Sequence, residues 1–174
     1  WSTGDTTQNI NGLQVGNVSI IVTDAAGCVS TLNNLIITEP PEISVLESTT
    51  DVSCNGGNDG ELSVSATGGT APYQFSIDGG NNWQNGGNFS LLAAGAFTIN
   101  IQDANGCNIT VNATINEPTT LTGNTVNIID VSCNAGNDGS FTTNGNGGTL
   151  PYQYSIDGGI TWQVSSNFNG LFAG

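Results

Sequence analysis

The sequence contains no lysine, arginine or histidine, so its 14 acidic residues give a formal net charge of −14. Proteins contact nucleic-acid phosphates and anionic lipid headgroups through basic side chains, so the missing residues argue against both partners. A Ser-His-Asp or Cys-His nucleophile, a lysine Schiff base and a histidine zinc site cannot be built here. Only carboxylates remain as acid–base groups, and we therefore expect a protein that is not an enzyme.

Long apolar runs are missing as well, and no stretch predicts a membrane-spanning helix. We expect no direct insertion into a membrane. Apolar residues make up 36% of the chain. They alternate with polar residues, which argues against disorder and is typical of strands with one buried face. In the centre of the chain this alternation predicts strands near residues 43–52, 61–67, 72–77, 82–91, 96–102 and 108–116.

The sequence repeats itself at an interval of 79 residues, which indicates tandem domains. Residues 51–60 return as residues 130–139, and Trp83 returns as Trp162. Turn-forming Asn-Asp-Gly and Asp-Gly-Gly clusters separate the short predicted strands. Short strands at this spacing are typical of β-sandwiches. We therefore expect an all-β chain of tandem Ig-like β-sandwich domains, each of about 79 residues.

Proline marks the expected junctions between these domains, because it fixes φ and ends strand pairing. The junctions fall at Glu39-Pro40-Pro41-Glu42 and at Glu117-Pro118. They predict the C-terminal part of one repeat at residues 1–39, a complete repeat at residues 40–117 and the N-terminal part of a third at residues 118–174. Since the junctions are short, we expect the domains to form an elongated, semi-rigid string.

The complete repeat contains four motifs in a fixed order. They are a Cys-Asn-Gly-Gly-x-Asp-Gly start at residues 54–60, a Gly-Gly-x-x-Pro-Tyr centre at residues 68–73, a Leu-x-x-Gly-x-Phe step at residues 92–97, and an Asp-x-x-Gly-Cys turn at residues 103–107 before the Glu-Pro end. Together they resemble the SprB repeat of giant surface adhesins from gliding Bacteroidota. That family has Tyr where this chain has Phe97. The resemblance implies export to the bacterial cell surface and supplies no catalytic residues.

The four cysteines predict disulfides formed in an oxidising compartment. Cys54–Cys107 lies inside the complete repeat, whereas Cys28–Cys54 and Cys107–Cys133 cross the junctions. We favour Cys54–Cys107, because four expected strands lie between the two residues and alternating strand directions return the chain to the same end of the domain. Cys28 and Cys133 then pair with cysteines outside this sequence. No Cys-x2-Cys pair supports a zinc site.

Three aspartates in predicted loops are candidate calcium ligands, namely Asp59, Asp78 and Asp103. Aspartate before glycine commonly caps its own turn, so we favour that structural role and expect no cofactor. Ca²⁺ stays open as the alternative.

Two other kinds of site are open. Trp83 and Trp162 lie on a predicted hairpin, where an exposed indole could stack on a sugar. Packing of these side chains against the core is the interpretation that we favour, because aromatic residues are only 7% of the chain. Thr6 resembles the acceptor of an O-linked glycan through its Asp-Thr-Thr context.

These features together predict a non-enzymatic structural or adhesive segment of a long secreted cell-surface protein or filament. We expect an extended, semi-rigid stalk that acts in surface adhesion or gliding motility at the bacterial surface. The alternatives are a polysaccharide-binding module that uses exposed tryptophan hairpins, and a self-assembling subunit of an extracellular polymer. The expected partners are neighbouring repeats, polysaccharide or other surfaces, and laterally associated copies.

Overall fold

The computed structural model describes residues 9–173, and all of its regular structure is β. The predicted all-β class is confirmed. The described residues include no helix long and apolar enough to cross a membrane. The strands are β1 (Gly16–Thr23), β2 (Val29–Ile37), β3 (Ser44–Thr50), β4 (Gly60–Thr67), β5 (Gln74–Ser76), β6 (Asn88–Leu92), β7 (Gly95–Gln102), β8 (Asn108–Ile115), β9 (Thr122–Ile129), β10 (Gly139–Asn146) and β11 (Asn167–Leu171).

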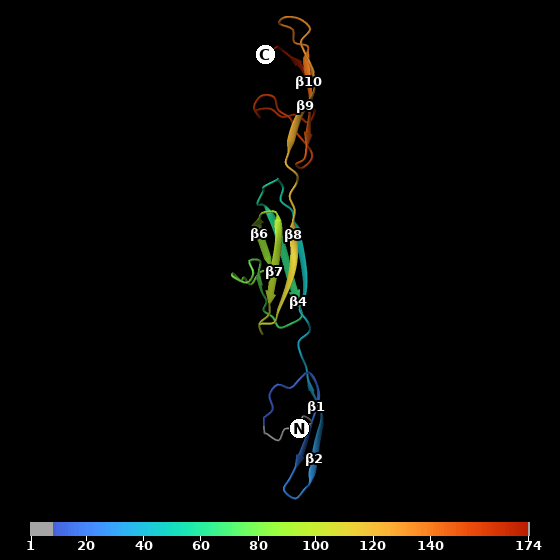
Figure 1. Ribbon diagram of the computed structural model, residues 1–174, viewed down its shortest axis with the longest axis vertical. Helices are drawn as coiled ribbons and strands as arrows, with labels where there is room; N and C mark the ends of the chain where they lie inside the picture. The colour runs from blue at the N-terminus through green and yellow to red at the C-terminus, as the bar shows by residue number, and fades with distance from the viewer. Residues whose placement is uncertain (1–8, 174) are drawn as a thin grey trace.

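The strands form three groups arranged along one long axis (Figure 1). β1 and β2 lie at one end, β3 to β8 form the central group, and β9 to β11 lie at the other end. The predicted junctions at residues 39–42 and 117–118 fall in the two non-strand segments between these groups. The chain therefore follows an extended path from group to group.

The central group consists of two three-stranded antiparallel sheets that pack face to face. One sheet has the order β3-β4-β6 and the other has the order β5-β7-β8. The alternating apolar residues of the strands point between the sheets, as their period of two requires. The buried cluster consists of Leu62 and Val64 from β4, Phe75 from β5, Ile99 and Ile101 from β7, and Ala113 from β8.

The strand order within the two sheets has a known counterpart. In an immunoglobulin-type sandwich, strands A, B and E lie in one sheet and strands C, F and G lie in the other. β3-β4-β6 and β5-β7-β8 match these two sets if the D strand is absent. We propose an immunoglobulin-like topology for the central repeat on this basis.

The outer groups are halves of the same fold. The β1–β2 hairpin corresponds to β7–β8, and the β11-β10-β9 sheet corresponds to β6-β4-β3. Neither has an opposing sheet within residues 9–173, so apolar side chains that the central repeat buries are open to solvent. Val22 is 61% exposed, whereas its counterpart Ile101 is fully buried at 0% exposed. Hollows on the outer groups are therefore uncovered core faces.

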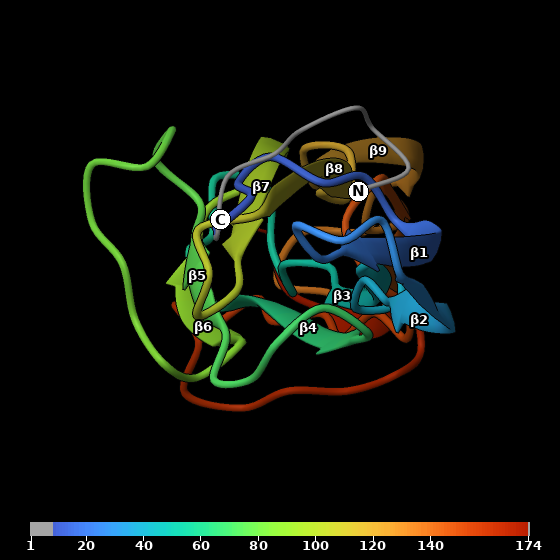
Figure 2. The same ribbon diagram turned by 90° about the horizontal axis from the view of Figure 1, so that it is seen from below.

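The strand expected over residues 82–91 is wrong in its first half. β6 begins only at Asn88, and before it Gln84 makes an isolated bridge with Phe75. The segment between β5 and β6 instead leaves the sandwich and projects from its side (Figures 1 and 2). Two consecutive glycines, Gly79 and Gly80, both with positive φ, start this excursion. Alternation alone cannot distinguish such a loop from a strand.

Candidate functional site at the inter-repeat junction

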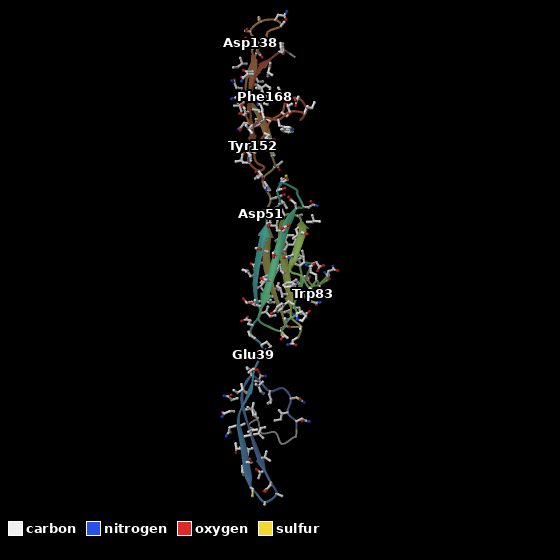
Figure 3. The ribbon with its side chains drawn as sticks, turned by 180° about the vertical axis from the view of Figure 1, so that it is seen from behind. Glu39, Asp51, Trp83, Asp138, Tyr152 and Phe168 are labelled. Carbon is white, nitrogen blue, oxygen red and sulfur yellow. The ribbon has the colours of Figure 1, made fainter. Side chains whose placement is uncertain are left out.

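The loop of residues 52–59, here named the cysteine loop, lies at the end of the central repeat from which the chain leaves. Asp51 holds this end together, because the Asn116 amide donates to Asp51 Oδ1 at 2.7 Å and the Val52 amide donates to the Asn116 carbonyl at 3.1 Å. Figure 3 shows Asp51 at this end, facing the Tyr152 end of the third repeat. The loop is thereby positioned against the departing chain.

The cysteine loop also bonds to the linker and to the next repeat. The Gly56 amide donates to Glu117 Oε2 at 2.7 Å, and Asn55 Nδ2 donates to the Pro118 carbonyl at 3.1 Å. Asn55 Oδ1 in turn accepts from Thr120 Oγ1 at 2.9 Å. The junction is therefore held by side-chain bonds as well as by the covalent linker.

One further bond reaches from the third repeat itself. Thr149 Oγ1 donates to the Ser53 carbonyl at 3.1 Å, and the two residues are 96 positions apart in the chain. Thr149 belongs to the loop that follows β10, so this contact fixes the body of the third repeat against the cysteine loop of the second. Each such hydrogen bond contributes about 1 kcal/mol.

The residues of the Cys-Asn-Gly-Gly-x-Asp-Gly motif give the cysteine loop its shape. The Ser53 amide donates to Asp59 Oδ1 at 3.0 Å, and the Gly57 amide donates to the Cys54 carbonyl at 2.9 Å. A Cβ at Gly57 would lie 2.9 Å from that carbonyl, so glycine is needed there. Hydrogen bonding by the side chain and then by the backbone of Ser53 lowers the pKa of Asp59.

The Gly-Gly-x-x-Pro-Tyr motif grips the linker at the opposite end of the repeat. The Gly69 amide donates to the Pro41 carbonyl at 2.6 Å, and the Tyr73 hydroxyl donates to the Gly68 carbonyl. The third repeat makes the same contacts. The Gly148 amide donates to the Thr119 carbonyl, and the Tyr152 hydroxyl donates to the Gly147 carbonyl. This motif therefore fixes how the chain enters each repeat.

The Asp-x-x-Gly-Cys motif forms a hairpin turn, residues 103–107, beside that entry. Asp103 is only 6% exposed. Its Oδ2 accepts from the Thr70 amide at 2.9 Å, and its Oδ1 accepts from the Asn105 and Cys107 amides, both at 2.9 Å. Burial opposes ionisation, but these amides outweigh it and lower the pKa of Asp103. The carboxylate is thus a structural cap between two loops.

The three calcium candidates lie in three separate loops and act as turn caps. Asp59 is in the cysteine loop, Asp103 is in the hairpin at the other end of the domain, and Asp78 is in the projecting loop. Among residues 9–173 no three acidic, cysteine or histidine side chains gather at one place. The structure does not bring these candidates together.

The tryptophans are tied down within their own loops. Trp83 Nε1 donates to the Gly80 carbonyl at 2.9 Å, and its ring lies over Gly80. Trp162 Nε1 makes the same bond to the Gly159 carbonyl at 3.0 Å. Trp83 is half-buried, whereas Trp162 is 60% exposed. Figure 3 shows Trp83 at the side of the central repeat, away from both junctions.

Asp78 organises the same projecting loop through hydrogen bonds to its carboxylate. Its Oδ1 accepts from the backbone amides of Asn81 at 3.0 Å and of Asn82 at 2.9 Å. Bonds from the amide and side chain of Asn82, and then from the side chain of Ser76, lower the pKa of Asp78 to about 2.

Acid is expected to destabilise the protein through these caps. The folded state lowers the pKa values of Asp59, Asp78 and Asp103, so it binds protons less readily than the unfolded chain. Their contribution is present above the ordinary aspartate pKa of about 4 and is lost as pH falls toward about 2. Urea midpoints should be constant from about pH 8 to 5 and fall below about pH 4. A midpoint that rises below that pH would contradict the assignment of these caps.

The predicted Cys54–Cys107 disulfide is wrong. All four cysteines are free and exposed. Cys54 lies in the cysteine loop beside Asn116, whereas Cys107 immediately precedes β8 at the other end of the domain. Eight residues of β8 separate these ends by about 25 Å, and a disulfide needs Cα atoms within about 7 Å.

The disulfide prediction failed because the segment between β5 and β6 was expected to be a strand that reverses the chain direction. β6 runs antiparallel to β4, and β5 runs antiparallel to β7, so β5 and β6 point the same way along the domain. The projecting loop between them returns the chain without a full strand. The pairing of Cys28 and Cys133 with cysteines outside the sequence stays a prediction, and Thr6 lies outside the described residues.

Sequence reasoning placed Glu117 at the junction without a contact for it, and it missed the other residues that cross the junction, namely Asn55, Thr120 and Thr149. A signal was present for one of them, because Asn55 sits between the loop cysteine and glycine of the repeated motif and returns as Asn134. The repetition marks this residue in the sequence, but only the structure shows that its partners are Pro118 and Thr120.

The sequence model of the SprB repeat matches this chain twice, over residues 46–82 and residues 125–161. Both matches include the cysteine loop, the Gly-Gly-x-x-Pro-Tyr motif and the start of the projecting loop. Comparison with curated proteins gave no match, and comparison with solved structures gave none. SprB repeats occur in cell-surface proteins, so the chain is a repeat segment of the surface-adhesin type. The recurring motifs that build its junctions and the two matches together show that this chain contains repeats of the SprB family.

Proposed function

We propose that this chain is a non-enzymatic stalk segment of a long secreted cell-surface protein, which holds an adhesive or motility element away from the cell. The observation that carries the proposal is the junction between the second and third repeats. There the linker is supplemented by bonds from Gly56 to Glu117, from Asn55 to Pro118, from Thr120 to Asn55 and from Thr149 to Ser53. A junction bonded in this way resists bending.

The chemistry of the motifs supports a mechanical role. Asp59, Asp78 and Asp103 accept hydrogen bonds from their own loops and are committed to holding them. The absence of basic residues also leaves trypsin no cleavage site, which suits a protein exposed outside the cell. Gliding motility and surface adhesion are the processes in which we propose that such a stalk acts, with neighbouring repeats as its direct partners.

A double variant tests the junction directly. Replacing Asn55 and Glu117 by alanine removes three of the bonds between the cysteine loop and the linker, with a summed contribution of about 2–4 kcal/mol. Small-angle X-ray scattering should then show a shorter mean end-to-end distance and a broader distance distribution. Asn134→Ala is the matched control, because this residue holds the same motif position in the third repeat and should leave the scattering unchanged.

Two outcomes would contradict the proposal. Identical scattering from the double variant and the parent chain would show that the junction bonds do not stiffen the string. Saturable binding of a polysaccharide that Trp83→Ala abolishes would favour the rival function, a carbohydrate-binding module. The second rival, a self-assembling polymer subunit, predicts scattering that grows with protein concentration.

A further inference from the structure

The junction between the first and second repeats contains a groove. At the next junction, the equivalent surface is covered by the cysteine loop of the preceding repeat. A cavity of about 320 Å³ lies at the entry end of the central repeat. One wall is formed by the linker residues Glu39, Pro40 and Glu42, and the other by the Asp103 hairpin with Cys107. Within the described residues nothing fills this groove.

The equivalent linker at the next junction is occupied by the cysteine loop. Gly68 and Gly69 face Glu42 and Ile43, as Gly147 and Gly148 face Thr120 and Leu121, so the two linkers correspond with an offset of 78 residues. Glu117, Pro118 and Thr120, which contact the loop, are therefore the counterparts of the three linker residues that line the groove. The groove is the surface on which the cysteine loop of a preceding repeat lies.

The bond between Thr149 and Ser53 indicates where the hairpin cysteine lies relative to the same loop. Thr149 bonds to the carbonyl of Ser53, the residue next to Cys54. Its counterpart in the central repeat is Thr70, which is bonded through its amide to Asp103 and through its hydroxyl to Asn105. The residue bonded to the loop backbone therefore belongs to the same small cluster as the hairpin that ends in Cys107.

We propose that the loop cysteine of each repeat forms a disulfide with the hairpin cysteine of the following repeat. Cys54 would pair with the counterpart of Cys107 in a complete third repeat, and Cys107 with the counterpart of Cys54 in the repeat before it. All four cysteines of the chain are exposed and free, as this pairing between repeats requires. The proposal goes beyond the stalk function and does not depend on it.

The other pairings fail on distance. Cys28 ends the β1–β2 turn and lies a whole strand away from the junction to which Cys54 would have to reach back. Cys107 and Cys133 are likewise separated by the lengths of β8 and β9. Strands of eight residues each measure about 25 Å, well beyond the Cα separation of about 7 Å that a disulfide allows.

The oxidation needs an acceptor for two electrons, and a low-molecular-weight disulfide such as oxidised glutathione serves. The Cys54 thiolate attacks it, releases one glutathione thiolate and forms a mixed disulfide. The hairpin thiolate then attacks the Cys54 sulfur of the mixed disulfide and releases the second glutathione. Both protein thiols lose their protons, and two molecules of reduced glutathione form.

The test extends this chain by one hairpin. Gly174 corresponds to Gly95, so appending a copy of residues 96–117 after Gly174 completes the third repeat and adds a fifth cysteine. In a glutathione redox buffer the extended chain should lose two hydrogen atoms in its intact mass. Mapping after cleavage at acidic residues should join the Cys54 peptide to the added cysteine. The unextended chain should keep four reactive thiols.

Serine variants separate this pairing from the others. Cys54→Ser should abolish the disulfide, whereas Cys133→Ser should leave it in place. Hydrogen exchange of the appended segment checks that the third repeat is folded. A bond between Cys54 and Cys107, a bond between Cys107 and Cys133, or no bond in a folded extended chain would each overturn the proposal.

Discussion

Replacing Asp103 by alanine is expected to unfold the entry end of the central repeat. The substitution removes the carboxylate of the almost fully buried Asp103 and leaves the partly buried amides of Thr70, Asn105 and Cys107 without their acceptor. Hydrogen bonds to a charged acceptor contribute about 1.5–3 kcal/mol each, and water replaces the lost acceptor only in part because the donors are partly buried. We expect a loss of about 4–5 kcal/mol, which is close to the whole stability of a small domain.

Hydrogen exchange of the Ile99 and Ile101 amides measures this loss locally, because both residues lie in the core of the central repeat. Their opening free energy should fall by that amount in Asp103→Ala. Asp103→Asn should fall in between, since it keeps one carbonyl oxygen but turns an amide group toward a backbone donor. Glu61→Ala, on the exposed face of β4, should change the opening free energy by less than about 0.5 kcal/mol. A similarly small change in Asp103→Ala would show that the cap is dispensable.

The sequence predicted the all-β class and most of the strands because period-two alternation is a local property. Leu62 and Val64 alternate with serines in the sequence, and these two residues are buried in β4 as expected. The turns followed from aspartate and glycine chemistry in the same way, since Asp78 and Asp103 cap the turns in which they stand. Local rules of this kind need no knowledge of the rest of the fold.

Strand direction could not be predicted in the same way, because it depends on what the loops do between strands. The segment that includes Trp83 has enough alternation for a strand, yet it leaves the sandwich as a loop. The strands before and after it, β5 and β6, therefore run in the same direction. Because of this one loop, Cys54 and Cys107 lie at opposite ends of the domain and not at the same end as predicted. The junction was also out of reach, since Asn55 and Thr149 act on residues of another repeat.

Gly68→Ala is expected to destabilise the central repeat strongly, because the single added methyl group combines an unfavourable φ with an overlap against the backbone. Gly68 has φ of +76°, and a Cβ there would lie 2.0 Å from the Glu42 carbonyl oxygen. The backbone fixes the position of the Cβ, and the carbonyl oxygen is itself a backbone atom, so no side-chain rotation relieves the contact. The linker must therefore move away from the repeat. The counterpart Gly147 shows the same geometry, with φ of +77° and 2.2 Å to the Thr120 carbonyl oxygen.

Gly79→Ala provides a matched control, because Gly79 also has φ of +76° but faces open space. The conformational cost, about 1–2 kcal/mol, is common to both variants. The backbone overlap exists only in Gly68→Ala and should add about 3 kcal/mol. Amide exchange of Ile99 should therefore separate the two variants by that difference. Equal losses of opening free energy in the two variants would mean that the linker moves away at no measurable cost. A larger loss in Gly68→Ala would show that the Gly-Gly motif holds the chain where one repeat passes into the next.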